Sequence, residues 1–237
     1  MVTNTTNEGL KSLYKRGEVI KKGACMSTTL GELKVRCVKK TQMDDRTDFS
    51  PTTLSQYEQE GEYKDYLNNV LDCINDGIQN LVINDRIPFK KYTLSNSGQS
   101  TTSIDLSTLN ITDLKSIQAI YYESENGVKE RVSFINLLST LELEDTYDNG
   151  NFIIIYSPYV RRLTKADSND LVLSTLGLQE THCSYLVYYS RNELYGKMEG
   201  FGNEQYFWRN AIDTYFEALK QEVNLPRQKR VKDVIGI

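Results

Sequence analysis

The residues able to do nucleophilic chemistry centre on one histidine. His182 is the only histidine in the 237-residue sequence, and Cys183 is its neighbour along the chain. A Ser-His-Asp or Cys-His arrangement would have to use His182. Neighbouring residues on a helix point about 100° apart and do not face each other. We therefore expect His182 to be a satisfied or half-exposed structural residue and not a catalytic one.

Metal and redox chemistry need clustered ligands, and the sequence offers none. The cysteines lie far apart, with no C-x-x-C pair, at Cys25, Cys37, Cys73 and Cys183. This spacing excludes a zinc ribbon or a redox motif in its usual form and favours reduced, packed thiols. The sequence predicts no metal site and no cofactor.

Two further patterns point only weakly to chemistry. Gly200-Phe201-Gly202 has the look of a phosphate-binding turn, but no strand precedes it and no Lys-Thr pair follows, so a hinge between helices is expected. The carboxylate pairs Glu142/Glu144 and Asp44/Asp45 are expected in polar turns, without the apolar pocket that raises a carboxyl pKa. No catalytic constellation is predicted, and the protein is expected not to be an enzyme.

Composition limits the class of protein. Hydrophobic residues make up 39% and charged residues 25%, which is ordinary globular usage. The N-terminus has no apolar run, so no secretion signal or membrane anchor is expected. A net charge of −4 argues against general nucleic-acid binding, which needs a broad positive field.

Charge and tyrosine are unevenly used. Residues 1–40 carry nine basic and three acidic groups, whereas residues 44–72 carry eight acidic and two basic ones. Such blocks indicate self-association or a polar partner, or simply two solvated faces of different sign. The 16 tyrosines against 7 phenylalanines suit surfaces buried on assembly, although genome bias with amphipathic core edges would give the same count.

Helices are predicted first along the chain. Thr29 with Glu32 three residues later is a capping-box signature for a helix running to about Lys40. Ser50-Pro51 is a favoured entrance to a long helix that Pro88 stops. Its predicted apolar stripe is Leu67, Val70, Leu71, Ile74, Ile78, Leu81 and Val82.

The middle of the chain predicts one compact antiparallel sheet. Its strands are expected at residues 89–94, 101–106, 117–123, 128–134 and 151–156. Asn126-Gly127 predicts a type I′ hairpin between two of them. A short helix is expected over residues 134–141, followed by an acidic turn over residues 142–148.

Helical periodicity then returns. A short segment is expected to open at Thr164 and Asp167, then a tyrosine-rich helix over residues 181–198. A final helix ends at Pro226, and its apolar stripe is Trp208, Ile212, Tyr215, Phe216, Leu219 and Val223.

This order of elements predicts an α+β fold, with a helical bundle formed by both ends of the chain and an inserted small antiparallel β-sheet domain. The expected divisions are a basic N-terminal arm (1–26), helical bundle (27–88), the inserted β-domain (89–157), helical bundle again (158–225) and a flexible C-terminal tail (226–237).

The arrangement resembles the head–tail connector, or adaptor, proteins of tailed bacteriophages, including the tail tubular A proteins. The stretches that carry the resemblance span roughly residues 27–220 and are patterns of helix and strand more than fixed residues. They are residues 28–33, 66–82, 86–94, 153–164 and 182–197, the last including the step Ser190-Arg191-Asn192-Glu193-Leu194-Tyr195.

The resemblance implies a structural virion protein without catalytic activity. It implies a homo-oligomeric ring of about twelve copies, docked between the portal protein and the next tail ring or nozzle protein. Genomic DNA would pass through the channel during ejection without sequence-specific binding, and no membrane is involved. The expected location is the virion head–tail interface, after assembly in the bacterial host cytoplasm.

In this family the C-terminal segment often reaches the portal. The matching residues here are a basic group followed by apolar ones, and they are the partner-binding candidates: Arg227, Lys229, Arg230, Lys232, Val234, Ile235 and Ile237.

Two other functions stay open at this point. One is a small carboxylate-dependent phage enzyme, which a pocket grouping three or more acidic residues would favour. The other is a monomeric assembly chaperone or binding module that pairs peptides with the edge of its sheet.

Overall fold

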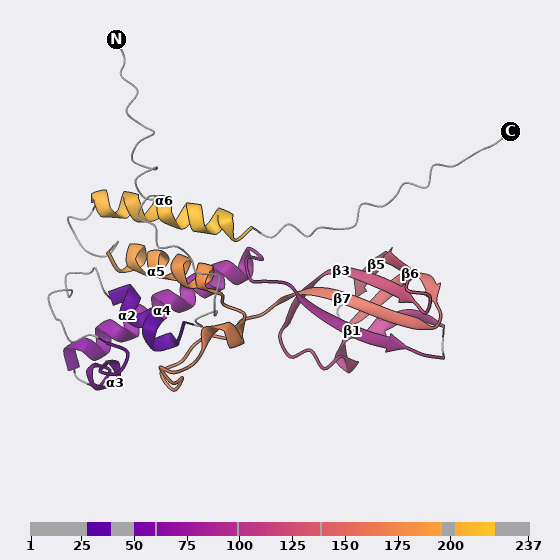
Figure 1. Ribbon diagram of the computed structural model, residues 1–237, viewed down its shortest axis with the longest axis horizontal. Coiled ribbons are helices and arrows are strands. Elements are labelled where there is room, and N and C mark those ends of the chain that lie inside the picture. The colour runs from indigo at the N-terminus through magenta and orange to yellow at the C-terminus, as the bar shows by residue number, and fades with distance from the viewer. Residues whose placement is uncertain are drawn as a thin grey trace, which may run out of the picture.

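The computed structural model describes residues 28–38, 50–59, 61–98, 100–137, 139–195 and 202–220. Figure 1 shows a helical part and a β part side by side along the longest axis of the molecule. All strand pairs are antiparallel. The predicted α+β class is confirmed.

The first described helix begins at the predicted cap. Helix α2 spans Leu30–Val38. Thr29 N–H donates to Glu32 Oε2 at 2.9 Å, and Glu32 N–H donates to Thr29 Oγ1 at 3.2 Å. This reciprocal pair is the capping box that the sequence predicts. The predicted end near Lys40 lies outside the described residues.

The long helix predicted from Ser50-Pro51 is two helices. Helix α3 covers only Leu54–Tyr57, and helix α4 covers Gly61–Ile83. Gln59 N–H donates to Gln56 C=O at 3.1 Å, and this tight i→i+3 bond ends the first helix. The predicted apolar stripe of α4 is confirmed, because all seven of its residues are buried.

Two longer helices follow the sheets. Helix α5 spans Glu180–Tyr195 and helix α6 spans Gly202–Ala218, while a 3₁₀ turn, η2, covers Leu173–Leu176. Helices α4 and α5 approach closely, since a Cβ added at Gly77 would lie 2.7 Å from Leu186 Cδ2. Helices α2, α4, α5 and α6 contribute to one hydrophobic core. The predicted hinge at Gly200 and Phe201 lies outside the described residues.

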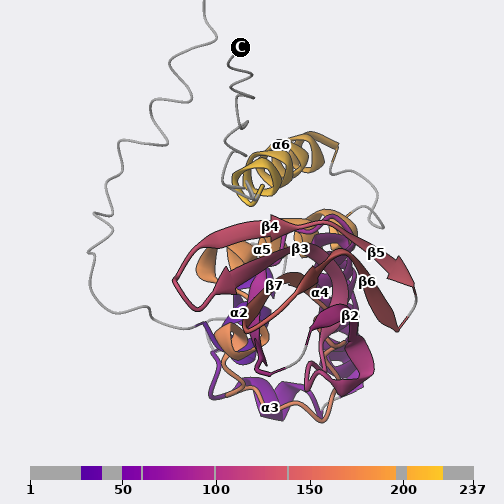
Figure 2. The same cartoon turned by 90° about the vertical axis from the view of Figure 1, so that its right-hand side faces the viewer.

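The β part holds two sheets where the sequence predicted one. Strands β1 (Lys90–Asn96), β7 (Gly150–Pro158), β3 (Leu114–Ser124) and β4 (Lys129–Val132) form a four-stranded sheet in that order. Strands β2 (Thr101–Asp105), β6 (Thr140–Tyr147) and β5 (Phe134–Leu137) form a three-stranded one, with the 3₁₀ turn η1 at Leu106–Thr108. Both sheets contribute to one core, around which the strands curve in Figure 2.

The predicted helix over residues 134–141 and the acidic turn over residues 142–148 are wrong. These residues form β5 and β6, paired in register from Phe134↔Leu143 to Leu137↔Thr140. The physical reason is alternation: Leu141 and Leu143 are buried while Glu142 and Glu144 are exposed, which is the period of a half-buried strand.

The Asn126-Gly127 hairpin is confirmed, but its turn type is not. Among the described residues only Asp85 has positive φ without being glycine, so Asn126 does not adopt the conformation that a type I′ turn needs. Gly127 has φ +75°, and its N–H donates to Ser124 C=O at 2.8 Å. Ser124 N–H in turn donates to Val128 C=O at 3.0 Å. The turn is therefore type I with glycine in the bulge.

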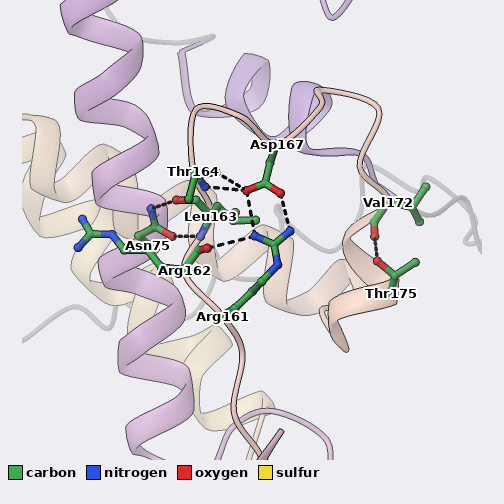
Figure 3. Close-up of polar contacts among 8 residues, drawn as sticks. All are labelled: Asn75, Arg161, Arg162, Leu163, Thr164, Asp167, Val172 and Thr175. Carbon is green, nitrogen blue, oxygen red and sulfur yellow. Dashed lines mark hydrogen bonds and ion pairs between the residues drawn. The ribbon is translucent and has the colours of Figure 1, made fainter. Parts of the chain in front are cut away.

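The chain that returns from β7 to α5 is held to α4 by the buried side chain of Asn75 (Figure 3). Asn75 Nδ2 donates to Leu163 C=O at 2.9 Å, and Leu163 N–H donates to Asn75 Oδ1 at 2.8 Å. Asn75 is 1% exposed, so these bonds replace water for a buried backbone segment.

A turn follows this clamp where the sequence predicted a short helical segment. Arg161 makes a two-pronged ion pair with Asp167, which also accepts the N–H of Thr164 at 2.7 Å. The hydrogen bond from Arg161 holds the pKa of the Asp167 carboxyl well below its usual range. Because the Asp167 carboxylate accepts a hydrogen bond from the backbone of this turn, the turn is stable without a helix.

We predict that Asn75→Ala lowers the free energy of unfolding by about 2 to 4 kcal/mol, because it leaves two buried backbone groups of Leu163 without partners. Urea denaturation of the full chain measures this. The matched control is Asn69→Ala at an exposed position of α4, where a change within about 0.5 kcal/mol is expected. Equal effects at the two positions would contradict the clamp.

Candidate functional site

His182 is a structural residue of the helical part. It is 1% exposed, and its Nδ1 accepts the N–H of Gln179 at 2.9 Å. Nε2 therefore carries the proton and donates to Arg86 C=O at 3.0 Å. His182 thus closes the first turn of α5 in the way an N3 side chain does in a capping box, and ties that turn to the end of α4. The expectation of a satisfied histidine is confirmed.

The three thiols that the structure describes are buried. Cys37, Cys73 and Cys183 are free and buried, and burial raises the pKa of both Cys37 and Cys183 to about 12. A thiol with such a pKa is almost entirely protonated at neutral pH and is a poor nucleophile. The expectation of packed thiols is confirmed for these three, and Cys25 lies outside the described residues.

The carboxylate pairs do not come together with other ligands. Glu142 and Glu144 lie exposed on the outer face of β6, and Asp44/Asp45 falls outside the described residues. Within the described ranges, no three His, Cys, Asp or Glu side chains are grouped closely enough to hold a metal ion. The helices that the structure describes include none with the length and apolarity to cross a bilayer.

The junction between the helical and β parts is held by residues that the sequence does not reveal. Asp85 follows α4 with φ +52°; its N–H donates to Val82 C=O at 3.2 Å, and the next N–H, of Arg86, donates to Leu81 C=O at 2.8 Å. This is the Schellman ending of a helix, with aspartate in the place usually taken by glycine. Lys115 of β3 reaches the same end and contacts Val82 C=O at 2.5 Å.

An aspartate tolerates this left-handed position because its carboxylate is used there. Lys115 Nζ lies 2.8 Å from Asp85 Oδ1 and 3.2 Å from Ile83 C=O. A cation at the C-terminal end of a helix stabilises the last carbonyls and the helix dipole. One lysine of the β part therefore caps a helix of the other part.

Arg86 extends the junction to α6. Its guanidinium lies 4.3 Å from the ring centroid of Phe216 and 3.6 Å from the carboxylate of Glu217. With His182 on its carbonyl, Arg86 joins the ends of α4, α5 and α6. The residues that Lys115 and Arg86 join are 30 (Asp85 and Lys115) to 131 (Arg86 and Glu217) positions apart in sequence, so no local pattern predicts these contacts.

A second polar network, around the buried Lys34, lies at the other end of the helical part. Lys34 of α2 is 3% exposed, and its Nζ lies 2.6 Å from Glu58 and 3.0 Å from Asn169 Oδ1. Lys34 and Glu58 border a cavity of about 260 Å³, whose lining is Lys34, Ser55, Glu58, Gln59, Lys64, Leu67, Asn68, Leu71 and Lys165. The lining holds one carboxylate, fewer than the three acidic groups that would favour carboxylate catalysis.

Exposed apolar side chains mark the surface that remains. The largest are Ile83, Val128, Ile135, Leu137, Tyr159, Tyr206 and Phe207. Ile135 and Leu137 lie together on β5, which is an edge strand, and their exposed fractions are 56% and 48%. Such a strand offers unpaired backbone groups as well as apolar contact area. The C-terminal candidates from Arg227 to Ile237 lie outside the described residues.

No protein-family model matches the sequence, and no curated protein matches it.

We predict that Asp85→Ala lowers the free energy of unfolding by about 1 to 2 kcal/mol, because alanine strains at positive φ and loses the Lys115 ion pair. Asp85→Gly loses the same pair without the strain and is expected to be at least about 0.5 kcal/mol more stable than Asp85→Ala. Thermal denaturation of both variants provides the comparison. Alanine and glycine variants of equal stability would show that the left-handed conformation is not present.

We predict that the contribution of His182 to the stability of the fold decreases as the pH falls. Burial lowers its pKa below the ordinary 6.5. Between the native pKa and the unfolded pKa of His182, the unfolded chain binds more protons than the folded one. The contribution of His182 to stability is therefore complete above about pH 6.5 and declines as the pH falls toward the native pKa. His182→Gln should therefore cost about 2 kcal/mol near pH 8 and less near pH 5, by denaturation at each pH.

Because the chain has a single histidine, its imidazole signals in NMR report this pKa directly. A native value at or above 6.5 contradicts the prediction. Titrations common to the two proteins cancel in the difference between wild type and variant.

Proposed function

We propose that this protein is a ring subunit of the head-to-tail connector of a tailed bacteriophage. Its proposed role is structural and not catalytic. The ring lies between the portal and the next tail ring or nozzle protein, in the virion, after assembly in the host cytoplasm. Its channel passes the genome during ejection without reading its sequence.

One observation carries the proposal: a helical part and a β part, each with its own core, are joined by a fixed junction. This is the layout that the connector resemblance implies over residues 27–220. A subunit in a closed ring must contact two neighbours through different surfaces, so a two-part subunit with distinct faces suits the role.

The helical part is proposed to be the bundle that both halves of the chain build. Helices α2 and α4 precede the sheets, while α5 and α6 follow them, and the four contribute to one core. Helix α5 contacts α2, α4 and α6, which places it at the centre of this part. The chain segments 1–27 and 221–237 lie outside the described residues and are proposed to contact other virion proteins.

The test is coexpression of the full chain with the portal protein encoded in the same genome, followed by electron microscopy of the purified product. We expect a ring of about twelve copies seated on the portal. A chain that remains monomeric and unattached to portal contradicts the proposal and favours a monomeric binding module instead.

The C-terminal segment is proposed to anchor the ring to portal. We expect a chain ending at Pro226 to form rings that no longer bind portal, because it lacks both the basic and the apolar residues. The matched control keeps all four basic residues and changes Val234, Ile235 and Ile237 to Ser. Loss of binding in this control assigns the anchor to the apolar residues. A shortened chain that still binds portal overturns the anchor alone.

A further inference from the structure

The two sheets of the β part present outer faces of opposite charge. Side chains alternate along a strand, and Tyr92, Leu94, Ile120, Phe152 and their cross-strand partners point into the shared core. Exposed side chains of opposite parity on the strands of the four-stranded sheet, such as Lys91 and Arg131, therefore point outward. Its four strands carry five basic and two acidic residues.

The outward basic residues of this sheet lie at its two edges. Lys91 is on β1, and Lys129 and Arg131 are on β4; all three are exposed. Glu123 is the acidic residue on this face, paired with Lys129 at 3.1 Å. Half-buried Tyr121 and Ile155 lie between the edges, on β3 and β7. We call this the basic face: Lys91, Tyr121, Glu123, Lys129, Arg131 and Ile155.

The three-stranded sheet has the opposite character. Strands β2, β5 and β6, as described, contain four acidic residues and no basic one. The pairings Asp105↔Thr140 and Ile135↔Glu142 place these side chains on one surface, because Leu141 and Leu143 point into the core. We call this the acidic face: Asp105, Ile135, Leu137, Glu142 and Glu144.

We propose that the acidic face of one copy docks on the basic face of the next copy. The two faces lie on opposite sides of one core, so the same contact can repeat from copy to copy. Such a contact is heterologous, and it produces rings when the rotation closes. This inference deepens the proposed ring function and rests on it, since it names the surfaces by which neighbouring subunits would meet.

Apolar and charged residues have separate parts in the contact. Ile135 and Leu137 of one copy would lie against Tyr121 and Ile155 of the next, removing apolar surface from water. The charges select the orientation, because two acidic faces or two basic faces repel each other. The contact should therefore weaken as salt screens it.

The charges allow a test by mixing. The variant Glu142→Lys/Glu144→Lys makes both faces basic, and the variant Lys91→Glu/Arg131→Glu makes both faces acidic. Each alone should self-associate at least about tenfold more weakly than the wild-type full chain. An equal mixture of the two should restore oligomers, because every contact in it can again join opposite charges. Sedimentation velocity over a range of concentration and salt measures all of these.

The apolar residues have their own variant. Ile135→Ser/Leu137→Ser should weaken association about tenfold or more without changing its dependence on salt. The matched control for Glu142→Lys/Glu144→Lys is Asp65→Lys/Asp76→Lys. It changes the same total charge at exposed positions of α4 and should associate like the wild type.

Each result bears on the proposal. Wild-type species larger than a dimer, lost in each variant and recovered in the mixture, support it. A wild type that stays monomeric, stops at a dimer, or is unaffected by the face variants overturns it, as does a mixture that does not recover. The test needs no portal, so its failure is distinct from failure of the connector role, which shows only when portal is present.

Discussion

The arrangement of this molecule depends on how helix α4 ends. Its last carbonyl groups face the point where the chain must leave for β1, and no further helical turn is there to satisfy them. Asp85 turns the chain through a left-handed conformation, and Lys115 brings a cation to the freed carbonyls. Because Lys115 belongs to β3, its cation lies at these carbonyls only when the β part is folded and in place. The two parts are therefore coupled through one capping interaction.

The return of the chain to the helical part is also fixed by side-chain contacts. Lys90 and Tyr156 both contact Asp113, and Tyr159 N–H donates to Asp113 C=O at 2.6 Å. Burial raises the pKa of Tyr156 to about 12, with the carboxylate of Asp113 acting in the same direction, so the phenol stays protonated and keeps donating. Beyond Tyr159, the side chain of Asn75 donates a hydrogen bond to Leu163 C=O. Both crossings between the parts are thus fixed by side-chain contacts.

Local patterns in the sequence predicted the elements that local physics governs. The capping box at Thr29 and the apolar stripe of α4 depend on residues three or four positions apart, and both are present. The acidic residues of β6 predict a turn, although they alternate with buried leucines, as in a half-buried strand. Asn75 and Leu163 are 88 positions apart, and Lys115 and Val82 are 33 apart. Contacts of that range depend on the topology and leave no periodic signal.

The basic face and the acidic face of the β part cannot be recognised from the sequence alone. The strands of the two sheets are interleaved along the chain, with β2 between β1 and β3 and with β5 and β6 between β4 and β7, so the charges of the two sheets average out along the sequence. Lys129 and Arg131 on β4 are followed within a few residues by Ile135 on β5, which belongs to the other sheet. A window moved along the sequence mixes both faces and reports neither. Only hydrogen-bonded pairing sorts the strands into one basic and one acidic sheet, and the surface that a neighbouring molecule meets is a product of that sorting.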